Sequence, residues 1–415
     1  MRRLLPAVLL VLACRSGGGA PNAADAGALP LVTCGVAPAW VKVGETATVR
    51  CTAGPGASGP AWSATPQRGQ LAAAGGGDAT FVLAARDVDP SFGDTVFTVT
   101  ASYASAAGTA TGTAAVTVIG NTWLTRSDIP AVQAIASDGS LVGAPILLEG
   151  LGGPPVAIAD RSDGAMLVAQ KPAPGAPPVM IYARSGAKLG AFDAVDGGGQ
   201  ALFSSDVPPR DILQARDGTV WVTGGRRPVL FDAAGRFRSL ALEAPDRTVG
   251  LAQLPDGRVA VTYLWAFAVG TYAENGQALE KKALAFAPPQ GESYAALGAL
   301  ASAGGGKLLL AAAHLGPTGW MGTLLRLDAA LGLDAELPPA ARVSRNVPYA
   351  LSLAGGEIAA APSPVGGETV ATCPSRFAAD LGARLGCLVE STLYRGMAHL
   401  GAAGAAGGST GVARQ

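Results

Sequence analysis

The sequence predicts an all-β protein, in which a small β-sandwich is followed by a six-bladed β-propeller. Three observations lead to this fold class. The 415 residues include 58 glycines and 30 prolines, which indicates many turns and few long helices. Apolar and polar residues alternate with period two in the first third of the chain. From residue 121 onward, pairs of glycine-containing turns recur about every 50 residues between apolar segments.

Residues 1–13 have the pattern of an export signal. Arg2 and Arg3 form a basic start, ten apolar residues follow, and Cys14 comes directly after Ala13. Ten apolar residues are too few to cross a bilayer core, which needs roughly 20 in a helix. The segment resembles the lipobox of bacterial lipoproteins, in which the signal is removed and Cys14 becomes the lipidated first residue. The resemblance implies a lipid anchor in the cell envelope. The alternative is an ordinary secretory signal with an incidental cysteine.

The segments at the two ends of the mature chain are expected to be unstructured. Residues 14–30 are rich in glycine and alanine and form a flexible tether with an r.m.s. span of roughly 20–25 Å. Arg15 stands where enteric lipoproteins retained in the inner membrane carry an aspartate, so the outer membrane is favoured by analogy. Residues 401–415 have nothing to bury and are expected to be a disordered tail.

Charge and cysteine content limit the partners. Charged residues make up 14% of the chain, with 30 basic and 30 acidic side chains, so nothing indicates a nucleic-acid partner. Four cysteines remain beside Cys14. Export favours two disulfides, and proximity in the sequence pairs Cys34 with Cys51 and Cys373 with Cys387, although four cysteines allow three pairings. Zinc is the alternative, but neither pair has the C-x-x-C spacing of a zinc site.

Residues 31–120 are expected to form the sandwich. Val32, Cys34 and Val36 fall on one face of a strand, and alternation from Ala47 places Cys51 on the core face of another. About seven short strands with an early tryptophan, Trp62, resemble a bacterial immunoglobulin-like domain. This segment departs from antibody-type domains because its disulfide would join the first two strands.

Residues 121–400 contain the repeat that predicts the propeller. Each unit has an Asp-Gly or Gly-Gly turn between two apolar strands, and a second hairpin follows it. The first set of turn glycines is Gly164, Gly218, Gly257, Gly306 and Gly356, and the second is Gly186, Gly235, Gly276, Gly332 and Gly382. Two hairpins per unit give four strands, the composition of a propeller blade.

The two ends of this region complement each other. Residues 132–139 match the second hairpin with no first hairpin before them, and residues 387–400 are expected to supply the missing inner strands. Five complete units and one split unit give six blades, and closure removes the exposed edge strands. Seven blades, or an open irregular β domain, remain the alternatives.

The segment from Asp217 to Gly224, Asp-Gly-Thr-Val-Trp-Val-Thr-Gly, resembles the blade core of NHL-repeat and related propellers. This architecture hosts enzymes and inert scaffolds alike. Some six-bladed relatives are calcium-dependent lactonases of the gluconolactonase type, which bind calcium through side-chain oxygens at the inner ends of the blades. The residues expected there in this chain are Gln170, Gly224, Tyr263, Ala312 and Pro362, without a carboxylate.

Only scattered side chains remain as candidates for chemistry. Asp160, Asp211 and Glu292 lie near the ends of expected strands, where they read equally as turn residues. A lone histidine, His314, is expected to be a hydrogen-bonded residue at a strand end on the rim. No catalytic residue and no protein metal ligand is assigned.

An aromatic cluster is the predicted ligand-binding site. If one strand runs through this segment, Tyr263, Trp265 and Phe267 share a face, and Tyr272 lies nearby. The alternative is that these rings pack between blades. We therefore expect a non-catalytic, envelope-anchored binding or scaffold module that presents a propeller to a protein or polysaccharide ligand. The alternative is a calcium-dependent, lactonase-like hydrolase at the propeller funnel.

Overall fold

The structure, a computed structural model, describes residues 29–399 except 43–44, 66–69, 75–77, 83–94, 127, 137–138, 174, 242–245, 286–287, 289, 304–305, 318, 345, 355–356, 365–372 and 388–393. The signal segment, Cys14, most of the tether and the C-terminal tail therefore lie outside the described residues. The described part consists of strands and one short 3-10 helix, η2 (Pro339–Ala341), which confirms the all-β prediction. It contains no helix long and apolar enough to cross a membrane.

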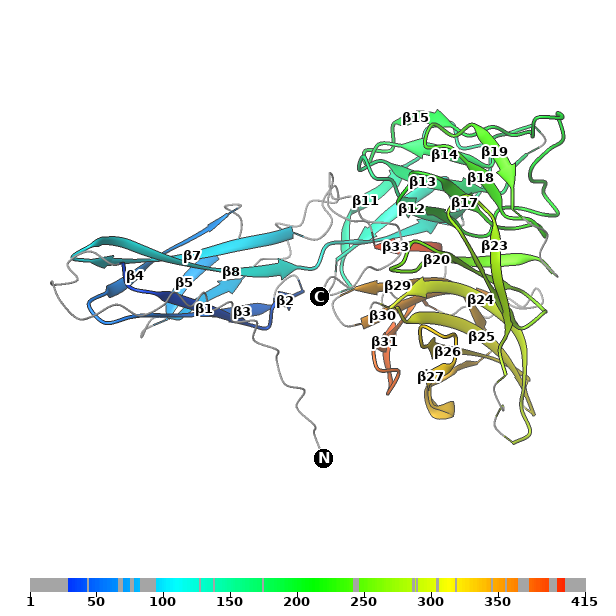
Figure 1. The fold of residues 1–415 in the computed structure, drawn as a ribbon. Coiled ribbons are helices and arrows are strands. Elements are labelled where there is room, and N and C mark those ends of the chain that lie inside the picture. The colour runs from blue at the N-terminus through cyan, green and yellow to red at the C-terminus, as the bar shows by residue number, and fades with distance from the viewer. Residues whose placement is uncertain are drawn as a thin grey trace.

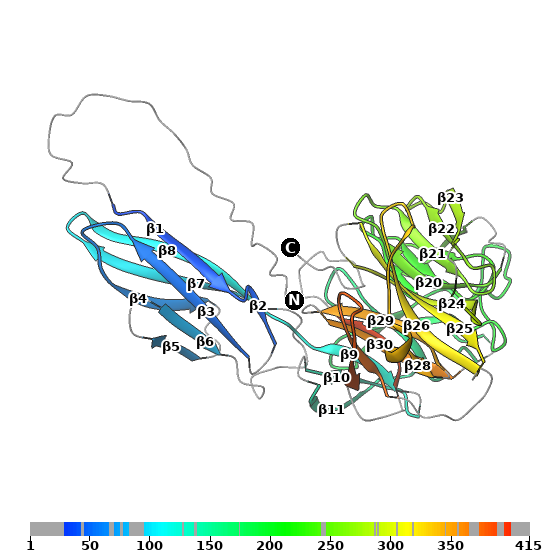
Figure 2. The same ribbon diagram turned by 90° about the horizontal axis from the view of Figure 1, so that it is seen from below.

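The N-terminal domain is a sandwich of two four-stranded sheets (Figures 1 and 2). One sheet has the order β1 (Val32–Ala37), β3 (Thr46–Ala53), β6 (Asp78–Val82) and β5 (Gln70–Ala74). The other has the order β2 (Trp40–Val41), β8 (Gly108–Val118), β7 (Thr95–Ser105) and β4 (Ser58–Thr65). Phe97, Val99 and Val116 fill the space between them with no exposed surface, and the Tyr103 hydroxyl donates to the Cys51 carbonyl at 2.8 Å. The alternation of apolar residues thus sets which face of each strand is buried.

Both expected disulfides are present. Cys34 and Cys51 lie opposite each other on the adjacent strands β1 and β3, with their Cα atoms 4.1 Å apart. Cys373 and Cys387 are bonded across a sequence separation of 14. In the chain-entropy model a loop of that length stabilises the fold by about 3 kcal/mol. The second bridge joins Cys373, two residues before the strand Ser375–Ala378, to Cys387 at the end of the strand Arg384–Cys387, the outermost strand of the last propeller blade.

Residues 122–399 form a propeller of six blades, each built on a four-stranded antiparallel sheet. Blade 1 has the order β33 (Tyr394–His399), β9 (Thr122–Arg126), β10 (Ala131–Ile135) and β11 (Leu141–Leu147) from the inside outward. Blade 2 comprises β12 (Pro155–Asp160), β13 (Met166–Gln170), β14 (Val179–Tyr182) and β15 (Lys188–Ala191), and blade 3 comprises β16 (Ile212–Gln214), β17 (Val220–Val222), β18 (Val229–Phe231) and β19 (Phe237–Leu240).

Blades 4 to 6 follow the same order. Blade 4 comprises β20 (Thr248–Gln253), β21 (Val259–Tyr263), β22 (Ala268–Tyr272) and β23 (Ala278–Ala283). Blade 5 comprises β24 (Ser293–Ser302), β25 (Leu308–Gly316), β26 (Gly319–Leu327) and β27 (Leu333–Glu336), with β28 (Val343–Ser344) paired to β26. Blade 6 comprises β29 (Asn346–Ala354), β30 (Glu357–Pro364), β31 (Ser375–Ala378) and β32 (Arg384–Cys387).

The ring closes through β33, as the sequence predicts. The C-terminal segment, however, supplies one strand of blade 1, and the N-terminal segment supplies the other three. The inner strands β33, β12, β16, β20, β24 and β29 each contact the next around the circle. β33 pairs antiparallel with β9, with His399 opposite Thr122. The expectation of two inner strands from the C-terminal segment was wrong, because residues 122–126 already supply the second strand of blade 1. Through its contacts with β12 and β29, β33 packs the first blade between the second and the sixth, so the ring has no open end.

The tight turns depend on left-handed backbone conformations. Gly164 and Gly218 adopt φ values of 85° and 86°, which suit glycine. In the turns between the third and fourth strands of blades 5 and 6, the left-handed residue is instead a leucine, Leu331 or Leu381, just before the glycine of the motif. At the first of these turns the Asp328 carboxylate accepts two backbone N–H groups, at 2.7 and 2.9 Å. Such side-chain bonds stabilise the turn without a glycine at that position.

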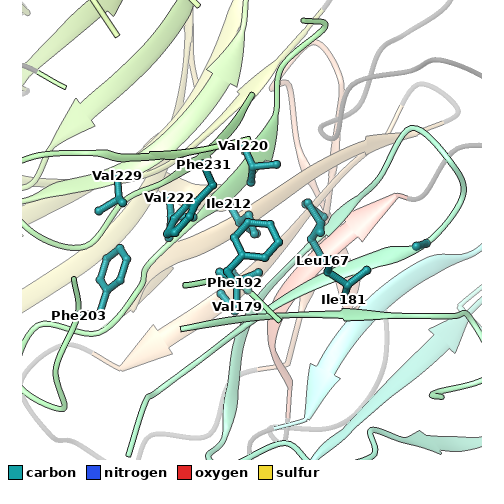
Figure 3. Close-up of a cluster of buried hydrophobic side chains, with 14 residues drawn as sticks. Leu167, Val179, Ile181, Phe192, Phe203, Ile212, Val220, Val222, Val229 and Phe231 are labelled. Atoms are coloured by element: carbon teal, nitrogen blue, oxygen red, sulfur yellow. The ribbon is translucent and has the colours of Figure 1, made fainter. Parts of the chain in front are cut away.

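Apolar layers between neighbouring blades form the core. Figure 3 shows the layer between blades 2 and 3, where the rings of Phe192 and Phe231 lie 4.9 Å apart. Side-chain amides add bonds between blades: Gln214 accepts the Ser162 N–H at 2.7 Å, and Gln253 accepts the Arg216 N–H at 3.1 Å. Gln214 is the last residue of β16 in blade 3 and binds a turn of blade 2. Gln253 is the last residue of β20 in blade 4 and binds a turn of blade 3.

The propeller has two distinct faces. We call the face with the tight turns, which join the first to the second strand and the third to the fourth, the turn face. The opposite face, with the longer connections, is the loop face. The sandwich joins the turn face, because β9 begins there through a buried linker at residues 119–121 (Figure 1). Lys42 of the sandwich also forms an ion pair with Glu357, which lies at that end of β30 and contacts Arg376 at 2.6 Å. The loop face therefore lies away from the sandwich.

Candidate functional site

The hairpin of β25 and β26 in blade 5 extends the sheet toward the loop face. β25 begins as an uninterrupted apolar run and continues to Gly316, and Gly319 begins β26 at a φ of 105°. His314 is consequently inside a paired strand, opposite Tyr294 on β24 and Met321 on β26. Its side chain has no exposed surface. The expectation of a rim histidine at the strand end was therefore wrong.

Three charged side chains meet around this histidine, and together with it we call them the acid–base cluster: Glu292, His314, Glu336 and Arg342. His314 Nδ1 lies 2.9 Å from Glu292 Oε2, and its Nε2 lies 3.2 Å from Glu336 Oε1. Neither contact has the angle of a hydrogen bond, because both nitrogens lack an aligned partner among the described residues. The imidazole therefore lies between two carboxylates without being bound optimally to either.

Arg342 neutralises part of this negative charge. Its side chain is 1% exposed, and its two terminal nitrogens contact one carboxylate each: Nη1 contacts Glu292 Oε2, and Nη2 donates to Glu336 Oε1 at 2.8 Å. It reaches the cluster from the connection between η2 and β28. Charge-assisted bonds from one guanidinium to two carboxylates hold the start of β24 and the end of β27 together.

Aromatic rings connect the acid–base cluster to blade 4. The Tyr294 ring lies 4.3 Å from the His314 ring, and its hydroxyl donates to Glu336 Oε2 at 3.0 Å. On its blade 4 side Tyr294 stacks on Phe267, with centroids 4.9 Å apart. Phe267 ends the turn between β21 and β22 in a left-handed conformation, with φ 44°. Polar and apolar contacts thus form one continuous set across the boundary between blades 4 and 5.

The surroundings keep Glu336 ionised and Tyr294 neutral. Burial on its own raises the pKa of Glu336. The close contact with His314, the hydrogen bond from Tyr294 and the charge of Arg342 together outweigh burial, so the pKa lies below its usual value. Burial, with the nearby charge of Glu336, raises the pKa of the Tyr294 hydroxyl well above its usual value. Near neutral pH, neither group therefore changes its charge.

Apolar side chains of blades 4 and 5 form an exposed patch on the loop face. We define the apolar patch as Leu264, Trp265, Leu315 and Trp320. Trp265 is 57% exposed and Leu315 is 44% exposed, whereas Leu264 and Trp320 pack on the buried pair Ala296 and Ala313. The turn that carries Trp265 is fixed at both sides: its N–H donates to Asp246 Oδ2 at 2.6 Å, and the Leu264 carbonyl accepts the Leu297 N–H at 2.8 Å. The indole is therefore displayed from a well-anchored turn.

The structure separates the four aromatic residues singled out in the sequence. β21 ends at Tyr263 and β22 begins at Ala268, so the assumption of one strand through this segment was wrong. Tyr263 and Tyr272 are each 2% exposed and share a hydrogen bond between their hydroxyls at 2.9 Å. They pack against Trp221 between blades 3 and 4. Trp265 is at the surface, and Phe267 belongs to the stack with Tyr294.

The three acidic residues considered as candidates in the sequence, Asp160, Asp211 and Glu292, lie at three separate positions in the propeller. Asp160 lies at the turn-face end of β12, 3.3 Å from Arg184, and Glu292 belongs to the acid–base cluster. Asp211 precedes β16, and its two oxygens accept the N–H groups of Ile212 and Leu251, each at 2.8 Å. Burial raises the pKa of Asp211 to about 7, because desolvation outweighs these two donors. Since this value exceeds that of the unfolded chain, Asp211's contribution to stability falls as pH rises from about 4 through about 7.

Three of the carboxylates considered above, those of Asp211, Glu292 and Glu336, are already bound to other groups. The Asp211 carboxylate accepts backbone N–H groups, and Glu292 and Glu336 are held by Arg342. Within the described ranges, no group of three or more His, Cys, Asp or Glu side chains is arranged to hold a metal ion. Held in this way, these three carboxylates do not offer a calcium ion the free oxygen ligands that it requires.

Comparison with known proteins gives no family assignment. No family model and no curated protein matches the sequence. A protein of unknown function from Bacteroides caccae aligns over 67% of this chain and 97% of its own, with 15% identity and a TM-score of 0.47. Virginiamycin B lyase from Staphylococcus aureus aligns over 65% and 91%, with 13% identity and a TM-score of 0.41.

A gluconolactonase from Xanthomonas campestris aligns over 56% of this chain and 76% of its own, with 15% identity and a TM-score of 0.42. These identities and TM-scores are too low to assign an activity to this chain. The propeller architecture rests on the strand pairing of the six blades and on the closure of β33 onto β9.

Proposed function

We propose that this chain is a non-catalytic binding or scaffold module, anchored in the cell envelope by a lipid on Cys14, that presents the loop face of its propeller to a protein or polysaccharide ligand. The N-terminal sandwich would be an immunoglobulin-like spacer between the anchor and the propeller. The outer membrane is the favoured location, by the analogy with Arg15 given above.

The arrangement of the two faces supports this proposal. The sandwich, which follows the tether, joins the turn face through the buried linker and the Lys42–Glu357 ion pair. The loop face consequently points away from the anchored end. A rigid scaffold that displays side chains on its connections is a common design for recognition.

The single observation that carries the proposal is the exposed indole of Trp265 in the apolar patch. A large aromatic side chain that is 57% exposed, on a turn fixed by two backbone hydrogen bonds, loses little conformational freedom when a ligand covers it. Tryptophan is enriched among the residues that contribute most to binding energy. Both a sugar ring and an apolar peptide side chain can pack on such a surface.

Replacing Trp265 with alanine tests the proposal. The probes are surface polysaccharide and solubilised envelope proteins from the source organism, measured separately by biolayer interferometry on the immobilised chain. We expect Trp265→Ala to weaken the binding of one probe by about 30-fold, the effect of a strong aromatic contact. Leu279→Ala is the matched control, because Leu279 is 51% exposed on the outer strand of blade 4. An absence of binding by the unmodified chain to both probes, or an equal loss in the control, would contradict the proposal.

The lipid anchor is tested separately with Cys14→Ser. Serine cannot carry the thioether-linked lipid, so the variant is expected to lose incorporation of radiolabelled palmitate and to leave the membrane fraction. Formation of the Cys34–Cys51 and Cys373–Cys387 disulfides, seen as a mobility difference without reductant, confirms that the variant is still exported. Palmitate label in the variant would show that Cys14 is not the lipidated residue.

A further inference from the structure

His314 is held in an environment that suits only its charged form. Both ring nitrogens face carboxylate oxygens, at 2.9 Å from Glu292 and 3.2 Å from Glu336. A neutral imidazole has one N–H, so its other nitrogen would direct a lone pair at a carboxylate. The charges lead to the same conclusion, because two glutamates and Arg342 sum to minus one, and an imidazolium brings the acid–base cluster to zero.

The groups that face His314 come from every element packed around it. Glu292 and Tyr294 approach from β24 and the residues before it, Glu336 approaches from β27, and Arg342 approaches from the connection to β28. β26 contributes Met321, which does not titrate. Glu336 stays ionised and Tyr294 stays neutral near pH 7. Histidine is the side-chain type whose ordinary change of charge falls closest to that pH.

We propose that His314 is a protonation-controlled latch for the loop face: its imidazolium holds Glu292 and Glu336 together, and loss of the proton loosens the boundary between blades 4 and 5. The loosening would reach the ligand face through Tyr294, which contacts both His314 and Glu336 and stacks on Phe267. Phe267 and Trp265 belong to the same four-residue turn. The latch is closed in acid and opens as pH rises, because deprotonation leaves an uncompensated negative charge.

The consequence for ligand binding rests on the function proposed above, whereas the latch itself does not. If Trp265 binds the ligand, affinity is higher at acidic than at alkaline pH. The test of the latch uses no ligand, so its failure and the failure of the proposed function are distinguishable.

Hydrogen exchange at about pH 5.5 and about pH 8, which bracket the titration of an ordinary imidazole, is the first measurement. After correction for intrinsic rates, we expect peptides spanning residues 262–268, 290–300 and 308–322 to exchange about fivefold faster at the higher pH. His314→Gln cannot be charged and is expected to show the same exchange at both pH values. The chain has only two histidines, so His399→Gln is the matched control and should behave like the unmodified chain.

Histidine NMR of the unmodified chain keeps the test decisive if His314→Gln fails to fold. With only two imidazole signals, His399→Gln assigns the one from His314. The increase in exchange must follow the titration of that signal. Exchange that is constant with pH, an equal increase in His314→Gln, or an increase that follows the His399 signal would each overturn the proposal.

Discussion

Replacing Arg342 with methionine is expected to lower the free energy of unfolding of the propeller by about 3–5 kcal/mol, the usual cost of removing one partner from a buried ion pair. The guanidinium is almost fully buried and contacts both Glu292 and Glu336. Methionine replaces most of its apolar stem but leaves two carboxylates in the same space without the guanidinium between them. Desolvation and repulsion of those carboxylates then destabilise the fold.

Guanidinium denaturation without reductant measures this effect. The matched control is Arg258→Met, because Arg258 is only half-buried and its partner Asp256 is exposed, with side-chain exposures of 34% and 52%. Such surface pairs contribute about 0–1 kcal/mol. Adding Glu292→Gln to Arg342→Met removes one of the repelling charges and should recover part of the loss. A loss no larger than that of the control would mean that Arg342 is not needed to hold the cluster together.

The fold was readable in the sequence because it depends on short-range patterns. The Asp-Gly turns at Gly164, Gly218 and Gly257 require left-handed backbone, and each lies between two apolar strands. Both disulfides were predictable because Cys34 and Cys51 lie on core faces of adjacent strands and the other two cysteines are close in sequence. The strand Thr122–Arg126 was not predicted, because a single five-residue strand between two domains has no repeat to identify it.

The acid–base cluster was not readable in the same way. Glu292, His314, Glu336 and Arg342 meet only because the sheet of blade 5 places distant positions side by side, and no sequence spacing records that. One signal was available: Leu308, Leu310, Ala312 and His314 fall on one face by alternation, so the histidine had to share the buried face of its strand. A buried histidine requires polar partners. The expectation that this strand ends just before His314 concealed that inference.

The error over the aromatic cluster has a related cause. Tyr263, Trp265 and Phe267 alternate as strand residues do, and alternation alone cannot distinguish a continuing strand from a turn. The turn is favoured because Trp265 and Leu264 each bond a neighbouring segment, to Asp246 and to Leu297, through their backbone. Those partners are 19 and 33 positions away and are brought close only by the packing of the blades. Tertiary contacts therefore decided the local conformation.

Gly250→Ala is expected to destabilise the propeller by about 3 kcal/mol, at the upper end of the range for overpacking. Gly250 lies on β20 at the closest approach of blades 4 and 5. A Cβ atom there would lie 2.5 Å from the Leu300 nitrogen and 2.9 Å from the Gly298 oxygen, both backbone atoms of β24. Backbone in a paired strand cannot rotate away as a side chain can, so the two inner strands must separate.

The same substitution breaks a polar bridge between the blades. The Gly250 N–H donates to the Thr262 hydroxyl at 2.7 Å, and that hydroxyl donates to the Gly298 carbonyl at 2.8 Å. Separation would leave these buried groups unpaired, which adds to the steric cost. Guanidinium denaturation measures the loss, and Gly197→Ala is the control, because a Cβ there meets nothing within 4 Å. If both variants keep the stability of the unmodified chain, β20 and β24 do not approach each other closely at Gly250. That result would contradict the close packing of blades 4 and 5 at this boundary.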